Sequence, residues 1–253
     1  MDSLASVVLI CVELFFNRPL IYITPLCSII GPYFWSPSFL LTTIFVTLNH
    51  ARFAKSISQI VIVFNRMSCV LVPMNYEKTW KILTPVSCFF IFFLPFGGTW
   101  NVIISRSFLQ PLRGGFTVGY LKTVRWAALS LFQSIYILTA LFFTVVCSSV
   151  TFFKLFFLPD RIKSAEKSLC FTSVFISLTF LMVAATQLSF AFCLSCDKTV
   201  QYLLQSLAFD AFTVGPAVII IATSKQIRGA LFSAGKPKKK VSVVSVSGRL
   251  SAL

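Results

Sequence analysis

The feature that most constrains this chain is a series of apolar runs, each long enough to cross a lipid bilayer. A bilayer core about 30 Å thick needs roughly 20 helical residues. Four runs reach that length without argument: residues 80–104, 127–155, 168–193 and 201–223. Only 11% of the 253 residues are charged, against about 25% in an average soluble domain. We therefore expect lipid, not water, to surround most of the chain.

Two further apolar segments are less regular. Residues 3–16 are short for a crossing, and residues 39–73 are too long for one and carry a polar interruption at residues 49–55. Residues 17–38 lie between them and contain four prolines, each of which removes a backbone donor. We expect that stretch to be an ordered loop at the membrane surface, with aromatic residues at headgroup depth: Tyr22, Tyr33 and Trp35.

These segments predict an all-α fold, a polytopic transmembrane bundle of six spans over residues 1–223. The expected spans are 3–16, 39–73, 80–104, 127–155, 168–193 and 201–223. Residues 224–253 are predicted to form an interfacial helix and a basic tail. If that tail is cytoplasmic, 14 of the 22 cations lie in cytoplasmic segments and six lie outside. The excess of Lys and Arg inside supports this orientation. The net charge of +15 therefore marks membrane loops rather than a nucleic-acid interface.

Several stretches resemble the nematode serpentine receptor class gamma (Srg) family of chemoreceptors. They are residues 16–27 (FNRPLIYITPLC), 50–59 (HARFAKSISQ), 64–71 (FNRMSCVL), 76–80 (YEKTW) and 223–228 (TSKQIR). The resemblance covers nearly the whole chain and implies a seven-helix fold like that of G-protein-coupled receptors. Met1-Asp2-Ser3 resembles a point inside the second helix of the family, so the first helix and the start of the second are expected to be absent.

One polar stripe follows residues 39–73. At 3.6 residues per turn it contains Asn49, Arg52, Ser56, Gln59 and Arg66, with Lys55 beside it. Charged groups inside a bilayer are costly and point to function. We expect Asn49, Arg52, Lys55, Ser56 and Gln59 to contact a small acidic or strongly hydrogen-bonding ligand in the outer half of the bundle. The alternative is that Arg52 and Lys55 reach the interface or pair with acids inside the bundle.

Three residues are candidates for signalling. Arg66 occupies the position where rhodopsin-like receptors carry an acid-Arg-aromatic triplet, but Asn65 stands where the acid would be. The resemblance implies a role for Arg66 in coupling to a heterotrimeric G protein; the alternative is a cationic anchor at a helix end. Asp210 lies in the middle of the last span and should be paired or protonated. Its expected cationic partners are Arg66, Arg52 or Lys55, and Gly215-Pro216 should kink its helix.

The tail and the cysteines complete the predictions. Lys236, Lys238, Lys239 and Lys240 form a basic run beside the membrane, which is typical of binding to anionic lipid. Cys27, Cys193 and Cys196 lie on the predicted outer side, where oxidation is allowed. A disulfide from Cys27 to Cys193 or Cys196 is the hypothesis.

No pattern in the chain recommends an enzyme, a metal site or a cofactor. There is one histidine, and neither a phosphate-binding loop nor a G-x-S-x-G motif occurs. The first hypothesis is therefore a chemosensory receptor with a small-molecule ligand and a G-protein partner. Such a receptor would act in the plasma membrane or a sensory cilium. The alternatives are a six-helix transporter or channel subunit, and a nonfunctional receptor fragment held in the endoplasmic reticulum.

Overall fold

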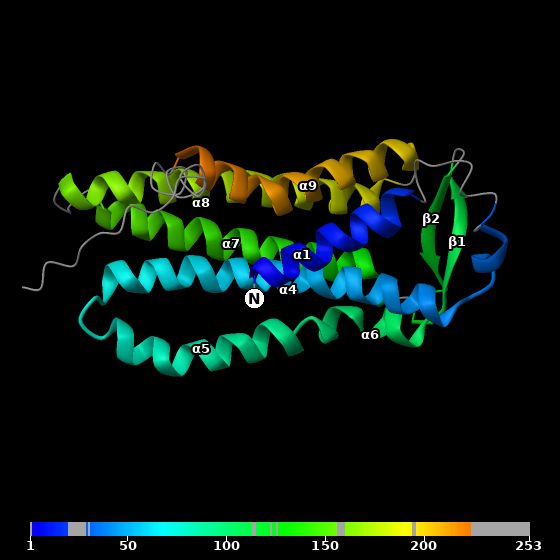
Figure 1. Ribbon diagram of the computed structural model, residues 1–253, viewed down its shortest axis with the longest axis horizontal. Helices are drawn as coiled ribbons and strands as arrows, with labels where there is room; N and C mark the ends of the chain where they lie inside the picture. Colours follow the sequence, from blue (N-terminus) through cyan, green and yellow to red (C-terminus); the bar gives the residue numbers. More distant parts are fainter. Residues whose placement is uncertain are drawn as a thin grey trace, which may run out of the picture.

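The computed structural model is an elongated helical bundle with a two-stranded hairpin across one end (Figure 1). It describes residues 2–19, 29, 31–112, 115–121, 123–124, 126–155, 160–193 and 196–223. The helices are α1 (Asp2–Val12), the π-helical turn η1 (Glu13–Asn17), α4 (Phe39–Leu71), α5 (Tyr76–Phe93), α6 (Phe96–Ile104), α7 (Leu129–Leu155), α8 (Asp160–Phe192) and α9 (Lys198–Thr223). The strands are β1 (Ser107–Leu112) and β2 (Gly115–Tyr120).

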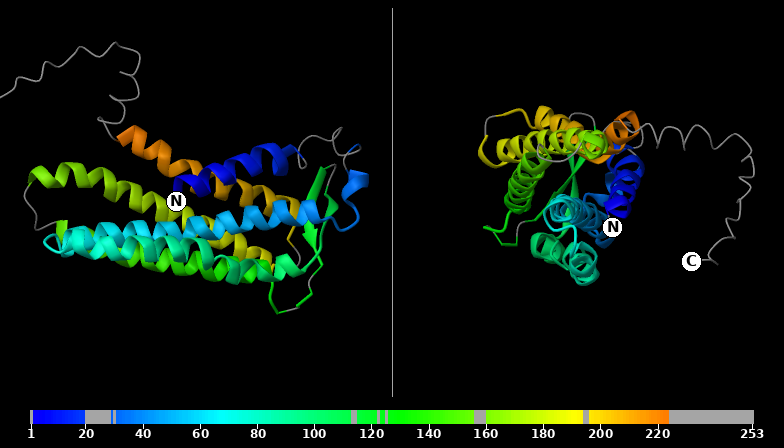
Figure 2. Two further views of the ribbon diagram at one scale, coloured as in Figure 1. Left: turned by 60° about the horizontal axis from the view of Figure 1, so that its bottom comes forward. Right: turned by 90° about the vertical axis from the view of Figure 1, so that its left-hand side faces the viewer.

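The long helices run up and down the bundle, and α4 lies at its centre, packed against α1, α5, α6 and α7 (Figure 2). Helices α7, α8 and α9 form a second layer in which successive neighbours pack together. Helix α1 starts about midway along the bundle and runs toward the hairpin end (Figure 1). The last residues of α4, α7 and α9 lie toward the opposite end, which we call the distal end (Figure 1).

Four helical segments within the described residues are long and apolar enough to cross a membrane: Tyr76–Ile104, Leu129–Lys154, Thr172–Phe190 and Val200–Ile219. They correspond to the four uninterrupted runs of the sequence. The first consists of α5 and α6, which meet at Leu94 and Pro95. Proline has no backbone N–H to continue a helical ladder, so the change of helix falls there. The two less regular predicted spans coincide with α1–η1 and α4, where charged side chains lower the hydropathy.

Many large apolar side chains lie on the outside of the bundle, and many polar side chains are buried inside it. Phe89, Phe93, Phe142, Phe153 and Leu207 are exposed on the outer faces. Among the buried polar residues, Thr144 donates to a carbonyl of its own helix, and Asn101 Nδ2 donates to the Ala127 carbonyl. In lipid every polar group must be satisfied within the protein. This distribution is therefore the one expected of a membrane-embedded bundle.

The hairpin is a departure from the all-α expectation. β1 and β2 pair antiparallel, from Ser107 opposite Tyr120 to Leu112 opposite Gly115. Leu109 and Phe116 pack on Leu41 near the start of α4. The Ser107 N–H donates to Thr42 Oγ1 at 3.1 Å. The hairpin is therefore attached to α4 and covers the end of the bundle toward which α1 runs (Figure 1).

A candidate ligand site beneath the hairpin

A cavity of about 310 Å³ lies between the helices beneath the hairpin. Its polar lining includes Asn49 and Arg52 of α4, Tyr120 of β2, Gln133 of α7, Gln187 of α8 and Gln205 of α9. Leu48, Phe45 and Phe190 are among the apolar residues of the wall. Small-molecule sites are concave spaces of this size, with apolar walls and a few placed polar groups. The cavity therefore has the size and chemistry of a site for a small organic molecule.

An amide pair fixes one wall of the cavity. Gln133 Nε2 donates to Asn49 Oδ1 at 2.7 Å, and Asn49 Nδ2 donates to the Phe45 carbonyl of its own helix at 2.7 Å. Both amide side chains are buried. A buried hydrogen bond across two helices holds their rotation, because breaking it leaves an unsatisfied polar group. The bond therefore sets how α4 and α7 face each other at the cavity.

Arg52 is the charged residue of the cavity lining, and its charge is compensated. Its Nη2 donates to Glu13 Oε1 at 2.5 Å, and the other oxygen of Glu13 accepts from Asn17 Nδ2 at 2.7 Å. The guanidinium also lies 4.2 Å from the centroid of the Phe209 ring. Arg52 Nε has no hydrogen-bond partner among the described residues. The Arg52 guanidinium thus contacts η1 through Glu13 and α9 through Phe209, and its Nε–H remains without a partner among the described residues.

The other three predicted ligand residues do not line the cavity, and two of them, Lys55 and Gln59, contact α1 instead. Lys55 Nζ donates to Ser6 Oγ at 2.6 Å and lies 3.6 Å from Asp2 Oδ1. Gln59 Nε2 donates to the same Asp2 oxygen at 3.0 Å. Ser56 Oγ donates to the carbonyl of Arg52, one turn earlier in α4. The stripe read from the sequence is therefore divided between the cavity and the packing of α1.

Asp210 is paired, but with Arg18 and not with Arg66, Arg52 or Lys55 as expected. Both side chains are partly exposed in a second, mainly apolar groove of about 330 Å³ between α1 and α9. The sequence suggested a surface loop from residue 17 onward. In the structure Arg18 follows η1 directly in helical conformation. This brings its guanidinium alongside α9.

Arg66 lies at the distal end of α4. Its Nη1 donates to Ser173 Oγ of α8 at 3.1 Å. The neighbouring Asn65 faces α5, where its Oδ1 accepts from the Tyr76 hydroxyl at 2.7 Å. One turn away, Trp80 Nε1 donates to Ser68 Oγ at 2.7 Å. Side-chain hydrogen bonds therefore join α4 to both α5 and α8 at this end.

Comparison with known proteins assigns this arrangement to a family. The sequence model of the Srg family of chemoreceptors matches residues 1–231. The chain belongs to the Srg family. Serpentine receptor class gamma-17 of Caenorhabditis elegans is 52% identical over 250 residues, covering 99% of this chain and 78% of that relative. Class gamma-15 and class gamma-16 of the same organism are 50% and 51% identical, over 91% and 92% of this chain and 73% and 72% of the relatives.

Membership of the Srg family makes this chain a serpentine chemosensory receptor, an integral membrane protein that crosses the bilayer several times. Its apolar helices and outward-facing aromatic residues agree with that assignment. Within the described residues of this receptor, no group of three or more His, Cys, Asp or Glu gathers as metal ligands would.

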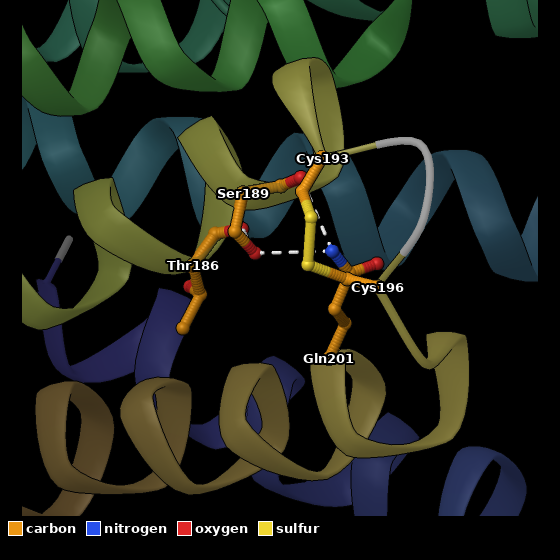
Figure 3. Close-up of a disulfide and its surroundings, with 5 residues drawn as sticks. All are labelled: Thr186, Ser189, Cys193, Cys196 and Gln201. Atoms are coloured by element: carbon orange, nitrogen blue, oxygen red, sulfur yellow. Dashed lines mark hydrogen bonds between the residues drawn. A yellow bond between two sulfur atoms is a disulfide. The ribbon is translucent and has the colours of Figure 1, made fainter.

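The disulfide prediction for this Srg chain is wrong about the partner. Cys193 bonds to Cys196, with Cα atoms 5.5 Å apart, in the short connection between α8 and α9 (Figure 3). Cys193 can form one such bond, so it is not joined to Cys27, which lies outside the described residues. Gln201 Nε2 donates to the Ser189 carbonyl at 3.1 Å beside the disulfide (Figure 3). The bond therefore closes a local turn instead of linking distant loops.

Several residues of the candidate site were missed from the sequence. Gln133 and Gln187 are single amides within apolar runs, and that isolation is itself a signal, since polar groups inside a membrane are costly. Tyr120 and Gln205 carry no comparable signal, because their role depends on how the hairpin and α9 are placed. The basic run Lys236, Lys238, Lys239 and Lys240 lies outside the described residues, and its lipid contact stays a prediction.

Proposed function

We propose that this receptor binds a small molecule in the cavity beneath the hairpin and signals to a heterotrimeric G protein from the distal end. The observation that carries the proposal is the cavity itself, a partly open polar space between the hairpin and α4, α7, α8 and α9 that is lined by Asn49 and Arg52. With the orientation expected from the distribution of cations, the hairpin end faces outward. A ligand from the surroundings then meets this end first, in the plasma membrane or a sensory cilium.

The distal end supplies the second part of the proposal. Arg66 reaches across to Ser173 of α8, so this bond has to rearrange before α4 and α8 can separate there. A ligand changes the population of such a state only through a difference in affinity between the two states. We therefore place the switch in the relative positions of α4 and α8. Arg66 is the residue that the open state releases to the G protein.

The test is ligand-dependent signalling in cells that express the full chain with a G protein and a calcium indicator. A panel of small volatile and water-soluble compounds is screened on the wild type, and active compounds are repeated on Arg66→Ala. The expected result is loss of the response with surface expression unchanged. Lys81→Ala is the matched control, because Lys81 is a largely exposed cation paired with Glu77 near the same end. It should respond as the wild type does.

Two results would contradict the proposal. A response that survives in Arg66→Ala at equal surface expression would remove Arg66 from coupling. A substrate-dependent current or uptake without any G protein would instead favour the transporter or channel alternative.

A further inference from the structure

Two hydrogen-bond donors of residues that line the cavity are buried without a partner among the described residues. Gln187 is 1% exposed, lines the cavity, and its Nε2 has no hydrogen-bond partner among the described residues. Arg52 also lines the cavity, and its Nε has no hydrogen-bond partner among the described residues. Buried polar atoms are nearly always paired in proteins, and an exception calls for a partner from outside the chain. Here both exceptions are N–H groups, which a ligand satisfies with an acceptor atom.

Tyr120 adds a third donor from the hairpin. Its hydroxyl oxygen accepts the Leu129 N–H at 2.9 Å, and its own proton is not used in a hydrogen bond to a described residue. Burial raises the pKa of Tyr120, and the hydrogen bond from Leu129 only partly opposes this shift. The phenol therefore keeps its proton at neutral pH. Gln187, Arg52 and Tyr120 reach the cavity from α8, α4 and β2.

The charge of the cavity limits the ligand further. Arg52 is the charged residue of the lining, and Glu13 already neutralises it at 2.5 Å. Lys55 lies outside the lining and is occupied by Asp2 and Ser6. A carboxylate ligand would lose its hydration without meeting an uncompensated cation, and it would approach the carboxylate of Glu13. An anionic ligand is therefore disfavoured, whereas the sequence predicted a small acidic or strongly hydrogen-bonding ligand.

We infer that the receptor selects uncharged small molecules bearing carbonyl, ester or ether oxygens, and that Gln187 and Arg52 Nε bind those oxygens. This inference rests on the proposed function, because it specifies the ligand class of the same cavity. The apolar wall formed by Leu48, Phe45 and Phe190 accommodates a hydrocarbon portion. The ligand class is thus a lactone, ester or ketone of moderate size.

The experiment measures binding directly, without signalling. The full chain is purified in lipid nanodiscs, and its thermal unfolding is followed with increasing concentrations of paired probes. Each pair consists of a medium-chain γ-lactone or methyl ester and the matching free acid, which is a carboxylate at neutral pH. A ligand that binds only the folded state stabilises it by RT ln(1 + [L]/Kd), so the rise of Tm with ligand concentration gives Kd, the half-saturating concentration. We expect the lactones and esters to raise Tm and the acids to have much smaller effects.

Two variants test the anchor. Gln187→Leu keeps the size of the side chain and removes its donor, so the half-saturating concentration of the neutral probes should rise about two- to tenfold, the usual value of one hydrogen bond. Gln201→Leu is the matched control: Gln201 is a buried amide that donates to Ser189 and does not line the cavity. Each variant is compared with its own unliganded Tm, so a general loss of stability does not imitate the effect.

The outcomes are distinct for the two proposals. Acids that stabilise as well as their neutral partners, a neutral series without effect, or a Gln187→Leu variant that binds as the wild type does would each overturn the inference. Neutral binding without a G-protein response in cells would leave the inference standing and contradict the proposed function. A G-protein response to acids alone would support the proposed function and contradict the inference about the ligand class.

Discussion

Glu13 and Arg52 should behave as one coupled unit, so removing either should destabilise the receptor more than removing both. Their side chains are 16% and 12% exposed, and the pair joins η1 to α4. Losing one partner of a buried ion pair costs about 3–5 kcal/mol, because the other charge stays buried without compensation. The residual exposure places this pair near the lower limit. We therefore expect Glu13→Gln to cost about 3 kcal/mol.

This loss is large enough to measure as a shift in Tm. For chains of about this length, 1 kcal/mol corresponds to roughly 2–4 °C, so Glu13→Gln should lower Tm by about 6–12 °C. The Arg52→Met variant should give a similar shift. The double variant leaves neither charge buried and keeps an apolar side chain against Phe209. It should therefore recover a large part of the loss, as the coupling energy of a double-mutant cycle.

The assay is a thermal scan of the four proteins in lipid nanodiscs, followed by tryptophan fluorescence. Glu77→Gln provides the control, since Glu77 and Lys81 form an exposed pair on α5, and such pairs contribute little. It should leave Tm unchanged within the error of the scan. A wild-type Tm for Glu13→Gln, or a double variant that shows the sum of the two single losses, would refute the coupling.

Three further substitutions test other parts of the structure. Gly98→Ala should lower Tm by several degrees, because the new Cβ would lie 2.7 Å from Cζ of the buried Phe53 ring. Such overpacking costs about 1–3 kcal/mol. Gly97→Ala is the control in the same scan, because its Cβ would lie at an ordinary 3.5 Å from Tyr136 Oη. Cys193→Ser should lower the free energy of unfolding by about 2 kcal/mol, the value for so short a loop, and the wild type with its disulfide reduced should have the same Tm as this variant. Ser173→Ala removes an acceptor of Arg66 and should raise ligand-independent G-protein signalling about tenfold, which a calcium reporter measures at matched surface expression.

The positions of most long helices could be predicted, because apolar runs mark them. The predicted span 39–73 became α4 (Phe39–Leu71), and 127–155 became α7 (Leu129–Leu155). The hairpin could not be predicted in this way, since β1 and β2 are stabilised by each other and by packing on α4, and neither is an apolar run. A strand pair at a membrane surface leaves no length signal in the sequence.

Only part of the candidate site could be predicted from the sequence, because helical periodicity identifies one face of a helix but not its neighbours. Helical periodicity placed Asn49 and Arg52 on one face, and that face does border the cavity. Periodicity says nothing about which neighbour a given turn meets, so it could not separate these two from Lys55 and Gln59, which meet α1. Partners far apart in the chain were hidden for the same reason: Arg18 and Asp210 are 192 residues apart.

The arrangement of α4 and α8 explains how one small cavity could influence the distant end of the receptor. Each helix carries one residue at the cavity and one at the distal contact, Arg52 and Arg66 on α4, Gln187 and Ser173 on α8. Both intervals are fourteen residues, or about 21 Å of helix. The helices run in opposite directions, so the pairs lie at corresponding levels. A ligand bound by both Arg52 and Gln187 fixes the distance between α4 and α8 at one end.

That constraint acts on the relative tilt of α4 and α8, because a helix moves largely as a rigid rod over this length. Helix α4 is tied at its hairpin end to η1 through Glu13 and to α7 through Gln133. A ligand that favours one tilt thereby favours either the intact or the broken Arg66–Ser173 bond. By reciprocity, breaking that bond must change ligand affinity by the same factor.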